Sequence, residues 1–266
     1  KMNLKVIFKK LPLHYQRKFR PLIEKIFYLI NLITLGQALH DTIGKVAISP
    51  LAKPFLKRSV AQQGEDLLID RLLSRLLKIN LNETHIYVDV GAFHAIDHSV
   101  TYLLYKRGWR GIAFDPSIDT KKNFKFWRPR DEFVCAAVGE TDNTTVSFFV
   151  PKNANNKSLG NTKYPSSSDK FREVKVHQVN LNEELKRRNF NKIDVLNIDV
   201  EGAELEILRS FNFDYFKPKI IALEIHGGDI QKNLESEEAK LILSNGYRCS
   251  ACAVITYFFV REDAIN

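Results

Sequence analysis

The apolar positions of the chain change their period repeatedly between residues 64 and 260. Apolar residues recur at helical spacing over 64–79, which predicts a helix. After it, short apolar runs that predict strands alternate with segments that predict helices. The expected strands are 86–90, 111–114, 133–138, 144–150, 174–179, 194–198, 219–225 and 254–260. The expected helices that follow the first are 99–106, 120–126, 181–188, 203–209 and 234–244. This alternation predicts an α/β fold with a doubly wound, mostly parallel sheet.

The composition is that of an ordinary globular protein, with 44% hydrophobic and 27% charged residues. It excludes a disordered chain, because such a chain lacks the apolar content that offsets chain entropy. Three cysteines are too few for a disulfide framework, so we expect a reducing, cytoplasmic compartment. Cys249 and Cys252 have C-x-x-C spacing, but no second ligand pair is nearby. We therefore expect them to be strand residues.

The net charge of +9 is concentrated at the N-terminus. Residues 1–60 contain 12 basic and 2 acidic residues, so the rest of the chain has a net charge of −1. We expect a basic helical arm over 1–58 and one domain over 59–266. The arm contains an uncharged run, 26–39, which is shorter than the ~20 residues that cross a bilayer as a helix. This run could lie on the inner face of an anionic membrane, or pack on the domain or on a second subunit of a homo-oligomer.

Two of the predicted strands end in an acidic residue, at the edge of the sheet where ligands of this fold class bind. Asp89 precedes Gly91 at the end of the first strand, and Asp115 follows the second. A loop that binds pyrophosphate would have the pattern G-x-G-x-x-G, which is absent here, and an acid would repel the phosphates. Asp89 could instead accept a hydrogen bond from an ammonium group, and Asp115 from both ribose hydroxyls. S-adenosylmethionine, a nucleoside with a cationic substituent, fits this pair of acids.

Longer stretches resemble the FkbM family of S-adenosylmethionine-dependent methyltransferases. The matching segments are SVAQQGED (59–66), YVDVGAFHAIDHSVTYLLYKRGWRGIAFDP (87–116), CAAVGE (135–140), IDVLNIDVEGAELEILRSFNF (193–213) and KPKIIALEIH (217–226). The resemblance covers about 59–226 and does not include the arm. It implies a Rossmann-like class I methyltransferase fold with an antiparallel C-terminal strand. One departure is Ala95, because the family often has proline after the motif His94.

The same resemblance implies a set of residues that bind S-adenosylmethionine. Asp89, Gly91 and Ala92 would hold its methionine part, and Asp115 its ribose. Further expected contacts come from the segment before the core, from the two strand ends and from the region near the adenine. They are Gln62, Asp66, Phe93, Pro116, Ser117, Ala137, Val138 and Asp199.

Methyl transfer is an in-line displacement in which the enzyme positions the acceptor and excludes water. A hydroxyl acceptor also benefits from a base near its proton. His226, directly after the strand 219–225, is the first candidate, with Asp199 and Glu201 as alternatives and His94 third.

Several acids near these candidates could instead hold a divalent ion. They are Asp199, Glu201, Glu204 and Glu224. Glu204 and Glu206 are also explained as the first turn of a helix, where the helix dipole favours acidic side chains. We therefore prefer a site without a metal.

The leading hypothesis is an O-methyltransferase that acts on a saccharide, a glycan or a related natural product, substrates that the resemblance implies. The polar segment 152–170 would select the acceptor. One alternative is a nicotinamide-dependent oxidoreductase, which the missing G-x-G-x-x-G disfavours. Another is a non-enzymatic scaffold whose arm binds a membrane or nucleic acid. Nucleic acid is not an expected acceptor, because Asp199-Val200-Glu201-Gly202 stands where methyltransferases of exocyclic amines usually have Asn/Asp-Pro-Pro-aromatic.

Overall fold

The computed structural model describes residues 59–151 and 171–265. The expected basic arm, 1–58, and the polar segment 152–170 lie outside these residues. Within the described ranges, no helix is long and apolar enough to cross a membrane.

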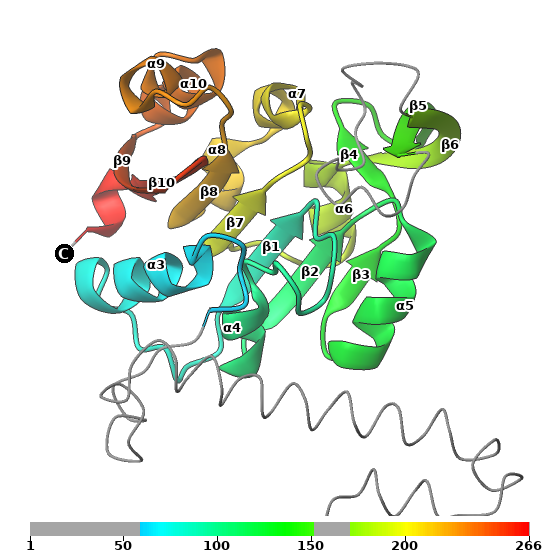
Figure 1. Cartoon of the computed structure of the whole chain (residues 1–266). Coiled ribbons are helices and arrows are strands. Elements are labelled where there is room, and N and C mark those ends of the chain that lie inside the picture. The colour runs from blue at the N-terminus through cyan, green and yellow to red at the C-terminus, as the bar shows by residue number, and fades with distance from the viewer. Residues whose placement is uncertain (1–58, 152–170, 266) are drawn as a thin grey trace, which may run out of the picture. The chain divides into compact units, whose positions relative to one another are not determined.

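Seven strands form the main sheet, in the order β3-β2-β1-β7-β8-β10-β9 (Figure 1). Neighbouring strands from β3 to β8 are parallel, and β10 is antiparallel to both β8 and β9. The strands are β1 (Ile86–Val90), β2 (Arg110–Phe114), β3 (Glu132–Val134), β7 (Val195–Ile198), β8 (Ile220–Glu224), β9 (Tyr247–Ala253) and β10 (Thr256–Arg261). The mostly parallel sheet with an antiparallel C-terminal strand is therefore confirmed. The chain first builds outward from β1 to β3 and then returns to β7 beside β1, which makes the β1/β7 border the topological switch point.

Helices cover both faces of this sheet (Figure 1). One face is covered by α3 (Glu65–Arg71), which continues as a π-helix (Leu72–Leu76), and by α4 (Tyr102–Lys106) and α5 (Ile118–Trp127). The other is covered by α6 (Leu181–Arg187), α7 (Glu204–Ser210), α8 (Phe213–Phe216) and α10 (Glu237–Ser244), with α9 (Ile230–Leu234) before α10. The alternation of side chains along β1 divides the core in two. Tyr87 packs in a cluster with residues of α3, whereas Val88 and Val90 belong to the larger cluster on the opposite face.

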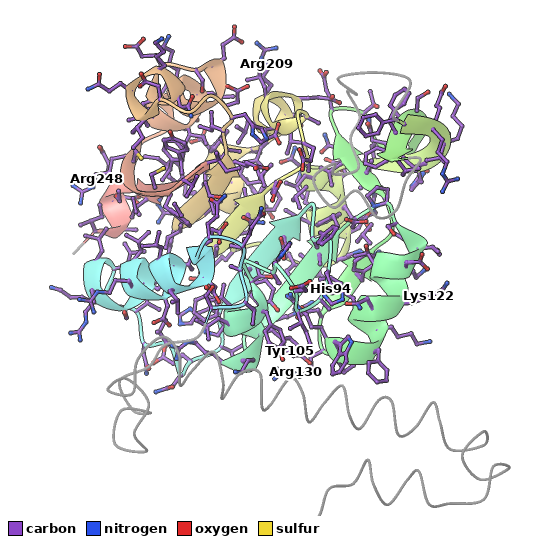
Figure 2. The ribbon with its side chains drawn as sticks, viewed as in Figure 1. His94, Tyr105, Lys122, Arg130, Arg209 and Arg248 are labelled. Carbon is purple, nitrogen blue, oxygen red and sulfur yellow. The ribbon has the colours of Figure 1, made fainter. Side chains whose placement is uncertain are left out.

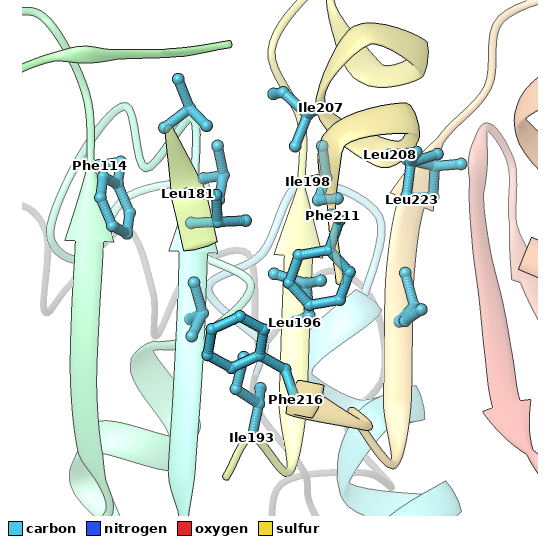
Figure 3. Close-up of a cluster of buried hydrophobic side chains, with 14 of the residues drawn as sticks. Phe114, Leu181, Ile193, Leu196, Ile198, Ile207, Leu208, Phe211, Phe216 and Leu223 are labelled. Carbon is cyan, nitrogen blue, oxygen red and sulfur yellow. The ribbon is translucent and has the colours of Figure 1, made fainter. Parts of the chain in front are cut away.

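The larger cluster fixes the helices that follow β7 against the sheet (Figure 3). Leu196 and Ile198 of β7 are fully buried. The rings of Phe211, which precedes α8, and Phe216, its last residue, stack with their centroids 5.4 Å apart. Because β7 ends beside this packed layer, the residues that follow it start from a fixed position.

The structure corrects two of the expected elements. The expected strand 133–138 is split between β3 and β4 (Ala137–Gly139), and β4 belongs to a second sheet of order β4-β6-β5. Its other members are β5 (Thr144–Pro151) and β6 (Phe171–Asn180). The expected helix 234–244 is also split, because Ser236 ends one segment and caps α10 by accepting a hydrogen bond from the Ala239 N–H. Cys249 and Cys252 lie in β9, as strand residues.

Candidate functional site at the ends of the parallel strands

Gly91 brings the carboxyl ends of β1, β2 and β7 together. Its φ is +86°, and a Cβ atom at this position would lie 1.6 Å from the carbonyl oxygen of Asp199. The N–H of Gly91 donates to the Phe114 carbonyl of β2, and the N–H of Asp199 donates to the Val90 carbonyl of β1. Only glycine combines this backbone conformation with so close an approach. The turn after β1 is therefore held directly against the residue that follows β7.

Asp89 is buried under this turn and is bonded within the protein. Its Oδ1 accepts a hydrogen bond from Asn197 Nδ2 at 2.9 Å, and its Oδ2 accepts one from the Thr101 hydroxyl at 2.5 Å. These bonds join β1 to β7 and to the segment that begins α4. Asp89 thus holds the loop after β1 in place, and its contact with a ligand ammonium stays a prediction.

A buried arginine that the sequence reading missed extends this network. Arg128 is 0% exposed, and both of its terminal nitrogens donate to the Thr101 hydroxyl at 3.0 Å. Its Nε forms an ion pair with Asp131 at 2.6 Å, and Nη2 donates to the Tyr87 hydroxyl. The guanidinium carbon also lies 4.7 Å from the centre of the Phe124 ring. Arg128 therefore connects α5 to Thr101, which supports Asp89. The sequence does not reveal this role, because Thr101 and Tyr87 are distant from Arg128 along the chain.

Asp115, directly after β2, is 7% exposed. Its carboxylate accepts hydrogen bonds from the backbone N–H groups of Phe93 at 3.1 Å and Ser117 at 2.8 Å. A carboxylate offers about four acceptor positions, so further hydroxyl donors can still be bound. Burial raises the pKa of Asp115 to about 6, although the backbone donors oppose the shift. Ser117 itself caps α5 by accepting from the N–H groups of Asp119 and Thr120.

The other expected cofactor contacts lie in different surroundings. Gln62 is exposed, and Phe93 is 59% exposed with a φ of +47°. Ala92 is buried in the turn, and Ala137 and Val138 are buried in β4 of the second sheet. Pro116 precedes the α5 cap and receives a contact from Cys135 Sγ at its carbonyl oxygen. The cofactor contacts of all six residues remain predictions.

The segment before α3 is fixed by Asp66, which is 2% exposed. Its carboxylate accepts from the Ser59 hydroxyl at 2.5 Å and from the Val60 N–H at 3.3 Å. Ala61 forms a parallel β-bridge with His98 in the loop after β1. A hollow of about 690 Å³ lies between Gln62, this loop and Trp127 at the end of α5.

His94 is held by its own loop and by α5 (Figure 2). Its Nδ1 accepts from the N–H groups of Ile96 and Asp97, and its Nε2 lies 2.7 Å from the side-chain amide of Asn123. Burial lowers the pKa of His94. With both ring nitrogens engaged, His94 is better explained as the residue that shapes the loop after β1 than as a base.

A second group of candidates meets where β7 and β8 end. His226 Nε2 lies 3.5 Å from Glu224 Oε1 and 3.9 Å from Glu201 Oε2. The side chain of His226 is 60% exposed, that of Glu201 43%, and that of Glu224 only 10%. The structure therefore brings His226 and Glu201 together, with the buried carboxyl of Glu224 beneath them.

Asp199, which directly follows β7, also belongs to this group and is more buried than Glu201 and His226. Burial, followed by a hydrogen bond with the carboxyl of Glu224, raises the pKa of Asp199 well above its usual range. Glu204 has a different role, since its carboxylate accepts from the N–H groups of Val200 and Gly202 at the start of α7. Glu204 is therefore accounted for by the helix start, as expected. We define the acidic cluster as Asp199, Glu201, Glu224 and His226.

Asn233 of α9, a further residue that the sequence reading missed, positions His226. Its side chain is buried, and its Nδ2 donates to the Ile225 carbonyl at 3.1 Å and to the Tyr257 hydroxyl at 3.0 Å. A Cβ atom at position 227 would lie only 2.2 Å from Asn233 Oδ1, so this position has room only for glycine. Asn233 thus binds the backbone before His226, and its side chain leaves room only for a glycine after it.

Replacing Asn233 by alanine should lower the free energy of unfolding by about 1–3 kcal/mol, because the buried Ile225 carbonyl loses its side-chain donor. Denaturant unfolding measures this loss. The exposed Asn245, which only contacts its own helix through the Leu241 carbonyl, provides the control as Asn245→Ala. Equal stability losses in the two variants would contradict the positioning role of Asn233.

Comparisons with known proteins place this arrangement in a family. Two solved structures to which the chain is weakly similar are methyltransferases, each 12% identical to the chain. One is the 1,6-didemethyltoxoflavin-N1-methyltransferase of Burkholderia thailandensis with bound 1,6-didemethyltoxoflavin and S-adenosylhomocysteine, with a TM-score of 0.37 over 75% of this chain and 77% of that chain. The other is the precorrin-6y C5,15-methyltransferase of Geobacter metallireducens GS-15, with a TM-score of 0.36 over 76% of this chain and 91% of that chain. No curated protein matches the chain. The model of the methyltransferase FkbM domain matches residues 89–249, from Asp89 of β1 to Cys249 of β9. The chain therefore belongs to the FkbM family of methyltransferases, with a Rossmann-like fold and S-adenosylmethionine as its methyl donor.

Proposed function

We propose that this methyltransferase acts on a hydroxyl group of a saccharide, a glycan or a related natural product. The observation that carries the proposal is the acidic cluster, in which the exposed imidazole of His226 lies 3.5 Å from the carboxyl of Glu224, and this carboxyl is hydrogen-bonded to that of Asp199. A hydroxyl becomes a good nucleophile only when its proton is removed, so its methylation benefits from a proton acceptor at the site. The cluster offers such an acceptor beside the turn of Gly91.

The residues at the strand ends fit the cofactor. S-adenosylmethionine supplies a methyl group on a positively charged sulfonium, and acidic surroundings suit this charge. Asp115 retains acceptor positions for ribose hydroxyls, and the bonds of Asp89 fix the loop that the methionine part would meet. Gly91 lies directly against the backbone of Asp199. The loop after β1, which would hold the methionine part of the cofactor, therefore meets the acidic cluster at this junction. We propose that the methyl donor and the acceptor meet across this junction.

Within the cluster, His226 is the first choice for the base. It is the most exposed member, and its Nε2 lies close to Glu224 and Glu201. These carboxylates would stabilise the imidazolium that forms when the ring takes a proton. Asp199 and Glu201 remain the alternatives.

The affinity for S-adenosylhomocysteine should fall about tenfold between pH 7.5 and pH 5, because Asp115 accepts ribose hydroxyls best as a carboxylate and its pKa lies at about 6. The contribution of Asp115 to the stability of the fold changes with pH in the opposite direction to the cofactor affinity. A pKa raised above the unfolded value stabilises the fold at low pH, and this contribution is lost as the pH rises through 6. Calorimetry at both pH values measures the affinity. The Asp115→Asn variant should bind more weakly and without this pH dependence; an identical pH dependence in the variant would contradict the assignment.

The substrate class can be tested with a methyl-transfer screen. Labelled S-adenosylmethionine would be offered with panels of glycans, nucleotide sugars and primary amines. We expect label on hydroxyl-bearing acceptors, and loss of transfer in Asp89→Ala and Asp115→Ala. Transfer to amines alone would contradict the proposal.

A further inference from the structure

We infer that Glu201, Glu224 and His226 form a binding site for a divalent cation of the Mg²⁺ or Mn²⁺ type at the ends of β7 and β8. The binding site is inferred from these residues alone, and only its role in catalysis rests on the proposed function. Each residue offers one ligand atom, and the three atoms lie within 4.8 Å of one another. Ligands 2.0–2.6 Å from a common ion are separated by distances of this size.

Three local features of the backbone hold these ligands in place. Glu201 has a φ of +56°, and Gly202 after it has a φ of +107°, so a tight turn projects Glu201 back toward β8. Glu224 is the last residue of β8. His226 follows Ile225, whose carbonyl is bound by the buried Asn233. Backbone strain of the kind found at Glu201 often accompanies functional sites.

A second observation, at Glu224, points to a cation-binding position. Glu224 Oε2 is buried, and no N–H or hydroxyl group within the described residues donates a hydrogen bond to it. The side chain is nine-tenths buried, and its carboxyl is hydrogen-bonded to the carboxyl of Asp199. Two carboxyl groups can bond each other only by sharing a proton, and a buried carboxylate without a partner is unfavourable. A cation at Glu224 would supply the positive charge that this pair lacks.

The donor atoms indicate the type of ion. Two carboxylates favour a hard cation such as Mg²⁺ or Mn²⁺, and an imidazole nitrogen adds affinity for Mn²⁺. Three protein ligands leave positions free, and the exposure of Glu201 and His226 places these positions on the open side of the site. If the proposed function holds, the acceptor hydroxyl would bind there, and the ion would lower its pKa. With the ion bound, His226 is a ligand rather than the base, and the ion itself makes the hydroxyl easier to deprotonate.

Direct binding of Mn²⁺ to the full chain, freed of metals by a chelator, tests the site. Electron paramagnetic resonance of free Mn²⁺ should show one site with a Kd below about 1 mM. Glu224→Gln should weaken binding at least tenfold without loss of thermal stability, because it removes one of two adjacent carboxyls. His226→Ala should also weaken binding. The matched control is Glu235→Gln, an exposed carboxylate after α9, which should bind as the wild type does.

Absence of a saturable site below 1 mM would overturn the inference, as would equal binding by wild type and Glu224→Gln. Binding of S-adenosylhomocysteine and methyl transfer, measured on the same samples, report on the proposed function separately. Transfer to a hydroxyl without a Mn²⁺ site overturns only the cation site. A Mn²⁺ site in a protein that methylates amines alone supports the cation site and overturns only the proposed function.

Discussion

Replacing His226 by alanine should lower kcat for methyl transfer by about 10²–10⁴-fold, because the variant loses either the proton acceptor or, in the cation site, a ligand of the ion that activates the hydroxyl. The side chain is 60% exposed, so its removal should leave the fold intact. Binding of S-adenosylhomocysteine should be unchanged, because the expected contacts of its methionine part and ribose lie at Asp89, Gly91 and Asp115 and do not include His226. Steady-state kinetics with labelled S-adenosylmethionine, together with calorimetry, measure the two quantities.

The matched control for this variant is His177→Ala. His177 is an exposed histidine of β6, in the second sheet. It should retain the kcat of the wild type. A His226→Ala enzyme with unchanged kcat, or one that has lost cofactor binding equally, would contradict a role at the acceptor side of the site.

Replacing Arg128 by alanine should lower the free energy of unfolding by about 3–5 kcal/mol, the cost of removing one partner from a buried ion pair. Asp131 would keep a buried charge without its partner, and the hydroxyls of Tyr87 and Thr101 would lose their donors. Burial already raises the pKa of Asp131, and without Arg128 this pKa should rise further. A raised pKa is stabilising at low pH, so the deficit should shrink as the pH falls and Asp131 takes a proton.

Denaturant unfolding of Arg128→Ala, compared with Arg130→Ala, measures this effect. Arg130 is exposed and donates to the Tyr105 carbonyl at the surface (Figure 2). Its removal should cost less than about 1 kcal/mol, as for other surface contacts. If Arg128→Ala does not fold, Arg128→Lys keeps the charge and should lie between it and the wild type. Equal stability of the two alanine variants would contradict the role of the Arg128 network.

The sheet could be predicted because its signal is local. Each parallel strand is buried on both faces and reads as a short apolar run, and the acids that follow it mark its carboxyl end. Asp89, Asp115 and Asp199 were found in this way. The second sheet could not be predicted, because the break at Ala136 changes neither hydrophobicity nor spacing. It depends on pairing of β4 with β6, some forty residues further along the chain.

The residues that position the site could not be predicted either. Arg128 lies in the segment Trp127-Arg128-Pro129-Arg130, which reads as an exposed basic turn. Its burial depends on Tyr87, Thr101 and Asp131, which the fold brings together. Nothing in the sequence distinguishes Asn233 from other polar residues, and its role depends on its contact with the loop after β8. Arg128 and Asn233 are polar residues whose buried partners include residues far along the chain. Such residues produce no periodic pattern in the sequence, so they could not be found from it.

The central claim is that this FkbM methyltransferase methylates a hydroxyl oxygen at the acidic cluster. Locating the transferred methyl group in the product, by mass spectrometry after incubation with labelled S-adenosylmethionine and a saccharide panel, tests it most directly. We predict a methyl ether on a hydroxyl of the acceptor, and loss of this product in His226→Ala despite retained binding of S-adenosylhomocysteine. A methyl group found only on nitrogen or carbon, or full activity of His226→Ala, would contradict the account.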